Sequence, residues 1–166
     1  MSSSWRPSRI VSGGQTGVDR AALDVALHLG IPHGGWCPRG RRAEDGTIPA
    51  QYQLSETPSS RYAQRTAWNV RDSDATLVLC SGPPRGGTAL TVRMARSLAR
   101  PCLVADPADL AAAASLRHTL AALAVQRLNV AGPRESQHPG IGAQALAFLL
   151  ALLEAEPAQA AGAASR

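Results

Sequence analysis

The chain has 166 residues, of which 45% are hydrophobic, and its formal net charge is +5. Because the sequence contains no lysine, arginine supplies all of the positive charge counted here. This length favours a single domain, and the hydrophobic fraction excludes a wholly disordered chain. The first residues lack the apolar core of a signal peptide, and the longest apolar stretch, residues 145–153, is too short to span a bilayer. We therefore expect a cytoplasmic protein that does not bind membranes.

A basic chain raises the question of nucleic-acid binding, because clustered basic residues contact phosphates. Only 4% of the residues are aromatic, no basic run exceeds two residues, and no nucleic-acid-binding motif is present. These features argue against nucleic acid as a partner. The cysteines Cys37, Cys80 and Cys102 are widely spaced and have no neighbouring histidine, so we expect free thiols and no metal held directly by the protein.

Short apolar segments alternate with longer segments of helical periodicity, which is typical of a parallel sheet flanked by helices. In chain order, we expect strands at 9–11, 31–36, 75–80, 101–105 and 128–131, and helices at 17–29, 61–70, 89–99, 106–126 and 141–154. Residues 37–60 are expected to form a long ordered loop, which is often a functional segment. The sequence thus predicts one α/β domain over 9–154, with a mainly parallel sheet of about five strands, and disorder at 1–8 and 155–166.

Ligands of open parallel sheets bind at the carboxyl ends of the strands. The loop after the first strand, SGGQTGVDR at 12–20, carries glycines that allow a tight turn before a helix whose N-terminal amides favour an anion. Thr16 is placed to cap that helix, and Asp19 and Arg20 lie in its first turns. The spacing matches neither G-x-G-x-x-G nor G-x-x-x-x-G-K-[ST]. A phosphate site is favoured here, and a structural turn is the alternative.

Two further loops have the same character. The segment SGPPRGGT at 81–88 places Gly86, Gly87 and Thr88 at another helix start, beside Arg85, and a simple capped helix is the alternative. The segment AGPRES at 131–136 supplies Arg134 and Glu135. The carboxylate of Glu135 can accept hydrogen bonds from ribose hydroxyls or act as a base. Alternatively, it faces its neighbour Arg134 at the surface.

The long loop sets Arg39, Arg41 and Arg42 against Glu44 and Asp45, which indicates either a lid over an anionic ligand or a solvated run of charges. Cys37 beside these arginines is a weak candidate nucleophile, because no partner histidine is near it in sequence.

A polar stripe of Arg61, Arg65, Asn69 and Asp72 follows at helical spacing. It contributes to the pocket if it faces the strand ends, and otherwise it is the wet face of a surface helix.

Five blocks of the sequence, SGGQTGVDRAALD, GGWCPRGRRAEDGTIP, RTAWNVRDSDATL, GGTALT and LNVAGPRES, together resemble proteins named putative molybdenum carriers. These form a circularly permuted branch of the SLOG superfamily, which is related to Lonely Guy (LOG) and lysine-decarboxylase-like proteins. The resemblance runs in order from residue 9 to about residue 152. It implies a Rossmann-like fold, homo-oligomers such as dimers or tetramers, and a pocket for a nucleotide or a phosphorylated pterin such as the molybdenum cofactor.

Residues and resemblance together predict a carrier or sensor that binds a phosphorylated small molecule, either the molybdenum cofactor or a nucleotide. The alternative is a nucleotide-processing enzyme of the LOG phosphoribohydrolase type, in which a glutamate follows the second glycine turn. Residues 89–92 have the sequence ALTV here, so no catalytic residue is assigned. The predicted ligand-binding residues are Gly13, Gly14, Gln15, Thr16, Gly17, Asp19, Arg20, Arg39, Glu44, Arg65, Arg85, Gly86, Gly87, Thr88, Gly132, Arg134 and Glu135.

Overall fold

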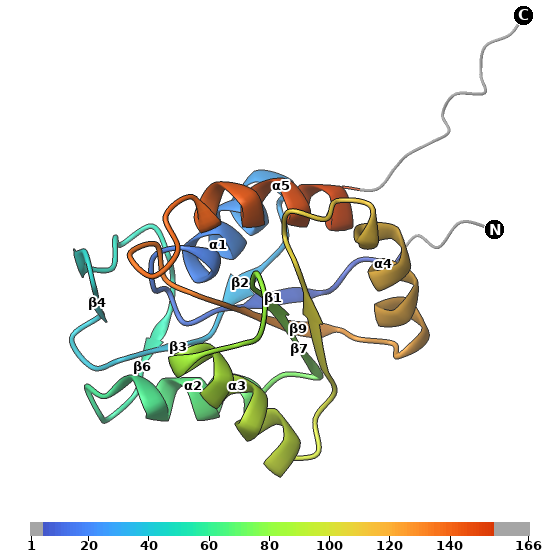
Figure 1. Ribbon diagram of the computed structural model, residues 1–166. Helices are drawn as coiled ribbons and strands as arrows, with labels where there is room; N and C mark the ends of the chain where they lie inside the picture. Colours follow the sequence, from blue (N-terminus) through green and yellow to red (C-terminus); the bar gives the residue numbers. More distant parts are fainter. Residues whose placement is uncertain (1–4, 155–166) are drawn as a thin grey trace, which may run out of the picture.

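Five strands form one parallel sheet in the order β2, β1, β9, β7, β8 (Figure 1). Their bounds are Arg9–Val11 for β1, His33–Gly34 for β2, Ala75–Leu79 for β7, Cys102–Ala105 for β8 and Arg127–Ala131 for β9. This computed structural model describes residues 5–154, so the predicted disorder of 155–166 falls outside the described residues. The predicted α/β class and five-stranded sheet are confirmed.

Helices cover both faces of the sheet. One layer contains α1 (Val18–Leu29), α4 (Ala112–Ala122) and α5 (Ile141–Leu153), and the other contains α2 (Tyr62–Arg71) and α3 (Gly86–Ser97) (Figure 1). Helix α5 packs against both α1 and α4. Every connection between parallel strands therefore crosses one face of the sheet, as parallel pairing requires.

The two faces differ in polarity. Because side chains alternate along a strand, Leu77 and Leu79 of β7 point into an apolar core shared with α1, α4 and α5. The opposite face of β7 and β9 carries buried Thr76 and Asn129, beneath α2 and α3. The main apolar core thus lies on one side of the sheet, and a buried polar layer lies on the other.

The strand order identifies where a cleft belongs. If β7, β8, β9, β1 and β2 are numbered 1 to 5, the strands lie side by side in the order 2-1-3-4-5. This is a common order of doubly wound sheets. The helix after β7 covers one face and the helix after β9 covers the other. The chain therefore leaves the sheet in opposite directions beside these two strands, which is the switch point where such folds bind ligands.

The predicted loop at 37–60 is ordered and contains short strands. Strand β3 (Trp36–Cys37) pairs with β6 (Ser55–Glu56), and β4 (Arg42–Ala43) pairs with β5 (Gly46–Thr47) in an antiparallel hairpin. The single strand expected at 31–36 is therefore wrong. Only His33 and Gly34 join the main sheet, and the chain turns at Gly35, with φ of +127°, into the small β3–β6 pair.

Two helix boundaries also differ from the prediction. Helix α4 begins at Ala112 because Asp106 instead forms a turn, its Oδ1 accepting a hydrogen bond from the Ala108 amide at 2.9 Å. It ends at Ala122, and Ala124 adopts the left-handed conformation with φ of +55°. Helix α3 begins at Gly86, three residues before the expected start, because the Arg85 carbonyl accepts from the amides of Thr88 and Ala89.

The N-terminal segment needs a correction where the structure describes it. Trp5 Nε1 donates to the Val125 carbonyl at 2.8 Å, and the Ser8 amide donates to the Gln126 carbonyl at 2.8 Å. Residues 5–8 are thus fixed against the fold, while 1–4 lie outside the described range. Within 5–154, no helix has the length and apolar character needed to cross a membrane.

Candidate ligand-binding site

The loops after β1, β7 and β9 surround a cleft on the side of the sheet that α2 and α3 cover. The wall from α2 consists of Tyr62, Arg65, Thr66 and Asn69, and the wall from α3 begins at Gly87 and Thr88. The cleft therefore lies at the switch point between β7 and β9, where the strand order places it.

Two buried asparagines hold the deep end of this cleft. Asn69 Oδ1 accepts from the Trp36 amide at 2.7 Å, and Asn69 Nδ2 donates to the Trp36 carbonyl at 2.9 Å, which ties α2 to β3. Asn129 Nδ2 donates to Thr76 Oγ1 at 3.2 Å, while its Oδ1 accepts no hydrogen bond from the described residues. One amide is thus committed to the fold, and the other keeps an acceptor for the cleft.

Arg65 supplies a buried positive charge. Only 8% of the residue is exposed, and Nη1 donates to the Gly13 carbonyl oxygen at 2.7 Å. Its Nη2 group donates to no described residue, and the guanidinium forms no ion pair with a described carboxylate. Because buried charges are normally paired, this guanidinium favours an anion in the cleft.

Asp19 has a raised pKa, which makes its carboxyl group the best candidate for a proton donor in the cleft. Burial raises its pKa from 3.8 to about 6, and Arg65, the Gln15 amide and Arg20 counteract part of that rise. Its Oδ2 accepts from the Gln15 amide at 3.3 Å. Asp19 lines the cleft, so this carboxyl group can exchange a proton near neutral pH within reach of a ligand.

The N-terminus of α3 faces the same space. No side chain caps this helix and its first turn holds no acidic residue. The amides of Gly86 and Gly87 donate to no described residue, and neither does the hydroxyl of Thr88, a residue that is only 5% exposed. Unpaired amides at a helix N-terminus, together with the helix dipole, bind anions.

The glycines of the first loop serve close packing. A Cβ on Gly14 would lie 2.7 Å from Leu54 Cδ1, and a Cβ on Gly17 would lie 2.8 Å from the Glu135 amide nitrogen. The amides of Gly14, Gln15 and Thr16 already donate to side chains of the same loop. This loop therefore presents Gly13, Gln15 and Asp19 to the cleft and does not offer an open row of amides.

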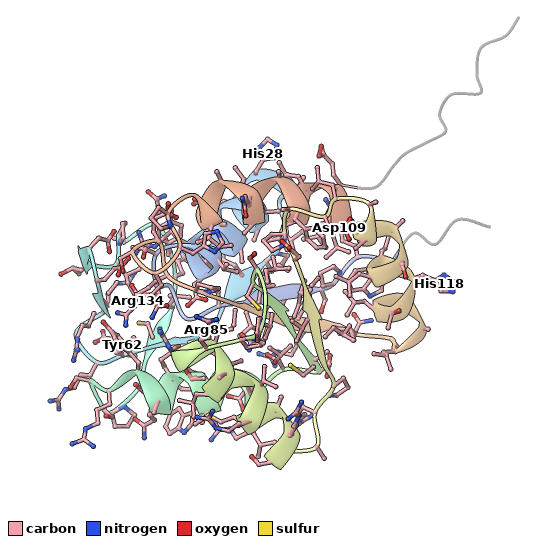
Figure 2. All side chains as sticks on the ribbon, viewed as in Figure 1. His28, Tyr62, Arg85, Asp109, His118 and Arg134 are labelled. Carbon is pink, nitrogen blue, oxygen red and sulfur yellow. The ribbon has the colours of Figure 1, made fainter. Side chains whose placement is uncertain are left out.

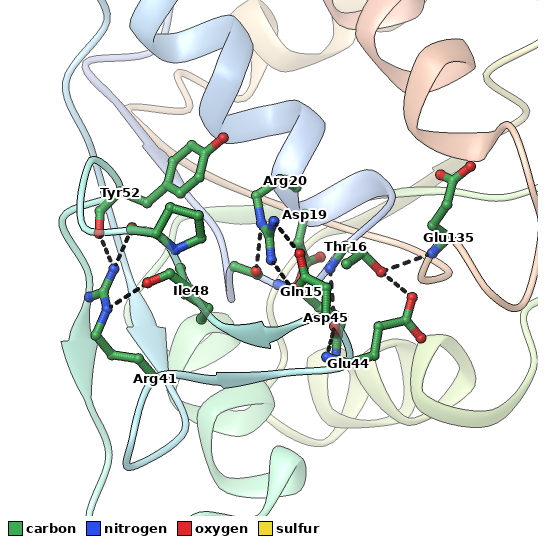
Figure 3. Close-up of polar contacts among 12 residues, drawn as sticks. Gln15, Thr16, Asp19, Arg20, Arg41, Glu44, Asp45, Ile48, Tyr52 and Glu135 are labelled. Carbon is green, nitrogen blue, oxygen red and sulfur yellow. Dashed lines mark hydrogen bonds and ion pairs between the residues drawn. The ribbon is translucent and has the colours of Figure 1, made fainter.

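The β4–β5 hairpin is fastened over the first loop by two carboxylates (Figure 3). Arg20 donates to both oxygens of Asp45, at 3.0 and 3.1 Å, and from Nε to the Gly14 carbonyl at 3.0 Å. Glu44 accepts from the hydroxyls of Thr16 and Ser136 and from the Ser136 amide. These hydrogen bonds, led by that from the Ser136 hydroxyl, lower the pKa of Glu44.

Glu135 is used to order the third loop. Its carboxylate accepts from the amides of Gly140 and Gly142 at 2.6 and 3.0 Å, at the start of α5, while its own amide donates to Thr16 (Figure 3). A carboxylate at a helix N-terminus stabilises that helix. Glu135 therefore joins the third loop to the first and to α5, and does not line the cleft.

A second cavity adjoins the cleft and shares Thr88 and Gln137 with it. Its other lining residues are Cys80, Pro83, Arg85, Gly86, Pro133 and His138. The cleft encloses about 110 Å³ and the second cavity about 230 Å³. Ligand pockets usually have volumes of about 300–1,000 Å³, so a ligand of nucleotide size would have to extend beyond the cleft.

All the predicted residues but Arg39 fall into three groups. Those lining the cleft are Gly13, Gln15, Asp19, Arg65, Gly87, Thr88, Gly132 and Arg134, and those lining only the second cavity are Arg85 and Gly86. Those that pack around the loops are Gly14, Thr16, Gly17, Arg20, Glu44 and Glu135. Arg39 is exposed and lines neither space. Thr16 does not cap α1, because its hydroxyl is bonded to Glu44 and the Glu135 amide.

Sequence reasoning missed several cleft residues, chiefly Tyr62, Thr66, Thr91 and Gln137. The helical spacing of Tyr62, Arg65, Thr66 and Asn69 places them on one face of α2, which is a usable signal. Gln137 follows the third loop and gives no comparable pattern.

The structure describes the surroundings of all three cysteines and of the residues that could bind a metal. Cys37 is fully buried, and burial raises the pKa of its thiol, so it lacks the thiolate character of a nucleophile. All three cysteines are free thiols. The part of the chain that the structure describes contains no group of three or more histidine, cysteine or acidic side chains able to hold a metal.

A doubly wound parallel sheet with a cleft at its switch point is the Rossmann-like architecture. Within that class, the chain belongs to the family described as the circularly permutated YpsA SLOG family, whose model matches residues 10–153. It is similar to a crystal structure from Syntrophus aciditrophicus SB of a protein named putative molybdenum carrier protein. That protein is 44% identical, the match covers 89% of this chain and 95% of that one, and the TM-score is 0.86. A comparison with curated proteins found no match.

Proposed function

We propose that this protein binds a phosphorylated small molecule in the cleft between β7 and β9. One observation carries the proposal: buried Arg65 with its unpartnered Nη2, buried Thr88 with its unpartnered hydroxyl, and Gly87 with its uncapped amide line one space. Buried polar groups are almost always hydrogen-bonded. A phosphate supplies several acceptor oxygens and negative charge to groups that are all donors.

The molybdenum cofactor and nucleotides are the two ligand classes that we propose. Both carry a phosphate on a larger organic part, which suits a small polar cleft beside a second cavity. The name of the protein from Syntrophus aciditrophicus supports the first class, and a carrier role follows from it. The phosphate would lie against Arg65 and the start of α3, and the organic part would extend beyond the cleft.

Asp19 favours one alternative, hydrolysis of a nucleotide. A general acid works best when its pKa is close to the working pH, and burial brings the pKa of Asp19 to about 6. The carboxylates of Glu44 and Glu135 in the neighbouring loops are committed elsewhere, since Glu44 binds Thr16 and Ser136 and Glu135 binds the start of α5. An enzyme at this site would therefore depend on Asp19.

Isothermal titration calorimetry tests both ideas. The wild-type protein would be titrated with molybdopterin, AMP, ADP-ribose and NAD, in parallel with Arg65→Gln and with Arg93→Gln, an exposed arginine on α3 outside both cavities. We expect binding of at least one ligand that Arg65→Gln weakens and Arg93→Gln preserves. Absence of binding to all four ligands would overturn the proposal. Release of free adenine from AMP by the wild type, together with loss of this activity in Asp19→Asn, would establish the enzymatic alternative.

A further inference from the structure

Three arginine side chains surround the ring of Tyr62 at the edge of the cleft. The guanidinium carbons of Arg42, Arg65 and Arg134 lie 4.8, 5.1 and 5.9 Å from the ring centroid. Figure 2 shows Tyr62 and Arg134 in the same part of the molecule, at the start of α2 and in the loop after β9. The three arginines come from β4, α2 and that loop, so the fold assembles this arginine–tyrosine cluster from distant parts of the chain.

The positive charge of this cluster is poorly compensated. Of the three arginines, only Arg134 lies within ion-pair distance of a described carboxylate, Glu44 at 3.8 Å, and that carboxylate already accepts from the hydroxyls of Thr16 and Ser136. Asp19 interacts electrostatically with Arg65 but forms no ion pair with it. Arg42 donates to the Ser60 carbonyl at 3.3 Å, and Arg65 donates to the Gly13 carbonyl. Cation–π attraction to the ring offsets only part of the repulsion between like charges.

A single phosphate leaves this imbalance in place. In the proposed function, the phosphate lies between Arg65 and the α3 amides, and Arg42 does not line that cleft. Arg65 and Arg134 both line the cleft and belong to the cluster, which makes the two anion-attracting regions adjacent. An anionic group beside Tyr62 would therefore be linked to the first phosphate through a short bridge.

We propose that the arginine–tyrosine cluster is a second anion subsite and that the ligand carries two linked phosphate groups, as a nucleoside diphosphate or another diphosphate ester does. This inference rests on the proposed function, because Arg65 is shared. The inner phosphate contacts Arg65 and the start of α3, and the outer phosphate lies among Arg42, Arg65 and Arg134. Two arginine forks then bind oxygens that a monophosphate does not have.

The probes for a test are inorganic phosphate and pyrophosphate, because they compare one and two phosphate groups without any organic part. Calorimetric titrations at matched ionic strength would use the wild type, Arg42→Gln, Arg134→Gln, Arg65→Gln and the control Arg93→Gln. Arg42 forms no ion pair with a described residue, so Arg42→Gln tests the cluster without releasing Glu44. Each variant removes one positive charge, which equalises the change in net charge.

We expect pyrophosphate to bind about tenfold more tightly than phosphate, the effect of one additional charge-assisted contact. Arg42→Gln should weaken pyrophosphate about fivefold or more and change phosphate less than about twofold, because Arg42 does not line the cleft. Arg134 does line the cleft, so Arg134→Gln should weaken both anions, and pyrophosphate more than phosphate. Arg65→Gln should weaken both anions, and Arg93→Gln neither.

The possible failures are distinguishable. If neither anion binds, or if Arg65→Gln leaves both affinities unchanged, the proposed function itself falls. If phosphate binds through Arg65 but neither Arg42→Gln nor Arg134→Gln weakens pyrophosphate more than phosphate, the second subsite is overturned and the proposed function stands.

Discussion

Arg65 Nη1 donates a hydrogen bond to the Gly13 carbonyl oxygen across 2.7 Å, and this bond joins helix α2 to the loop after β1 at the wall of the cleft. A Cβ on Gly13 would lie 2.7 Å from the same Nη1 atom. Glycine at 13 therefore makes room for the arginine. With Nη1 fixed in this way, Nη2 of the planar guanidinium donates to no described residue and stays free for a proposed ligand.

Replacement of Arg65 by lysine tests the importance of that planar fork. Lysine keeps the positive charge but cannot donate to Gly13 and to a ligand oxygen in one fixed geometry. We expect Arg65→Lys to bind phosphate about tenfold more weakly than the wild type, and Arg65→Gln to bind more weakly still. Calorimetric titration measures both, and full affinity in Arg65→Lys would show that charge alone suffices.

Asp19 should make stability depend on pH. Its folded pKa of about 6 lies above the ordinary 3.8, so between these values the folded state binds more protons than the unfolded state. The free energy of unfolding therefore falls as pH rises through this window, by about 3 kcal/mol for this group, and levels off above it. Asp45 and Glu44 have lowered pKa values and act in the opposite direction, because their contribution is lost as pH falls.

Urea unfolding of the wild type and Asp19→Asn across that pH range isolates the effect. The stability of the wild type relative to Asp19→Asn should decrease as pH rises from 3.8 to about 6. Asp109→Asn, at an exposed carboxylate in the turn before α4, serves as the control for the loss of one carboxylate. A constant difference between wild type and Asp19→Asn would contradict a raised pKa at this position.

The two glycines that flank α1 allow the packing of the loops to be tested. Gly17 and Gly30 have φ of +80° and +70°, so alanine is strained at both. A Cβ at Gly30 meets nothing within 4 Å, whereas one at Gly17 collides with the backbone of Pro133 and Glu135. We expect Gly30→Ala to cost about 1–2 kcal/mol of unfolding free energy.

Gly17→Ala should cost clearly more than Gly30→Ala, because Gly17, with ψ of −128°, lies outside the left-handed helical conformation of Gly30, and because the third loop must move away from the first. The difference in urea-unfolding free energy between the two variants is the measurement. Equal losses would mean that the contact between residue 17 and the third loop does not constrain the fold.

The sequence predicted the fold through local patterns that the structure retains. The apolar run of β7 and the glycine loop before α1 were recognised because each lies within a few residues, and so were the cleft residues Gly87 and Thr88. The arginine cluster was not predicted as a unit. Its members meet only because β9 lies between β1 and β7, an order that the succession of elements does not reveal.

The roles of two carboxylates show the same limit. Glu44 and Glu135 lie in charged loops, where binding or catalysis is a reasonable hypothesis. In the structure, both are committed to backbone amides and hydroxyls that are distant in sequence or lie at the start of α5. The residue type predicts that these groups accept hydrogen bonds. Which donors they meet depends on the path of residues 37–60 and 132–140 in three dimensions.

Glu44 provides the last prediction, because it links the β4–β5 hairpin to the first and third loops. Glu44→Gln keeps the shape of the side chain, but it replaces one acceptor oxygen with a donor and removes the charge that strengthens the bonds from Thr16 and Ser136. We expect faster amide hydrogen exchange in residues 42–47 and 134–137, while the exchange of β7 stays unchanged. Glu154→Gln, which replaces an exposed carboxylate after α5, is the control.

The same acceleration should appear in the wild type as pH falls through the lowered pKa of Glu44, after correction for the intrinsic pH dependence of exchange. Unchanged exchange in Glu44→Gln would show that the Arg20–Asp45 pair and the bond from the Glu44 amide to Gln15 hold the hairpin without the Glu44 carboxylate.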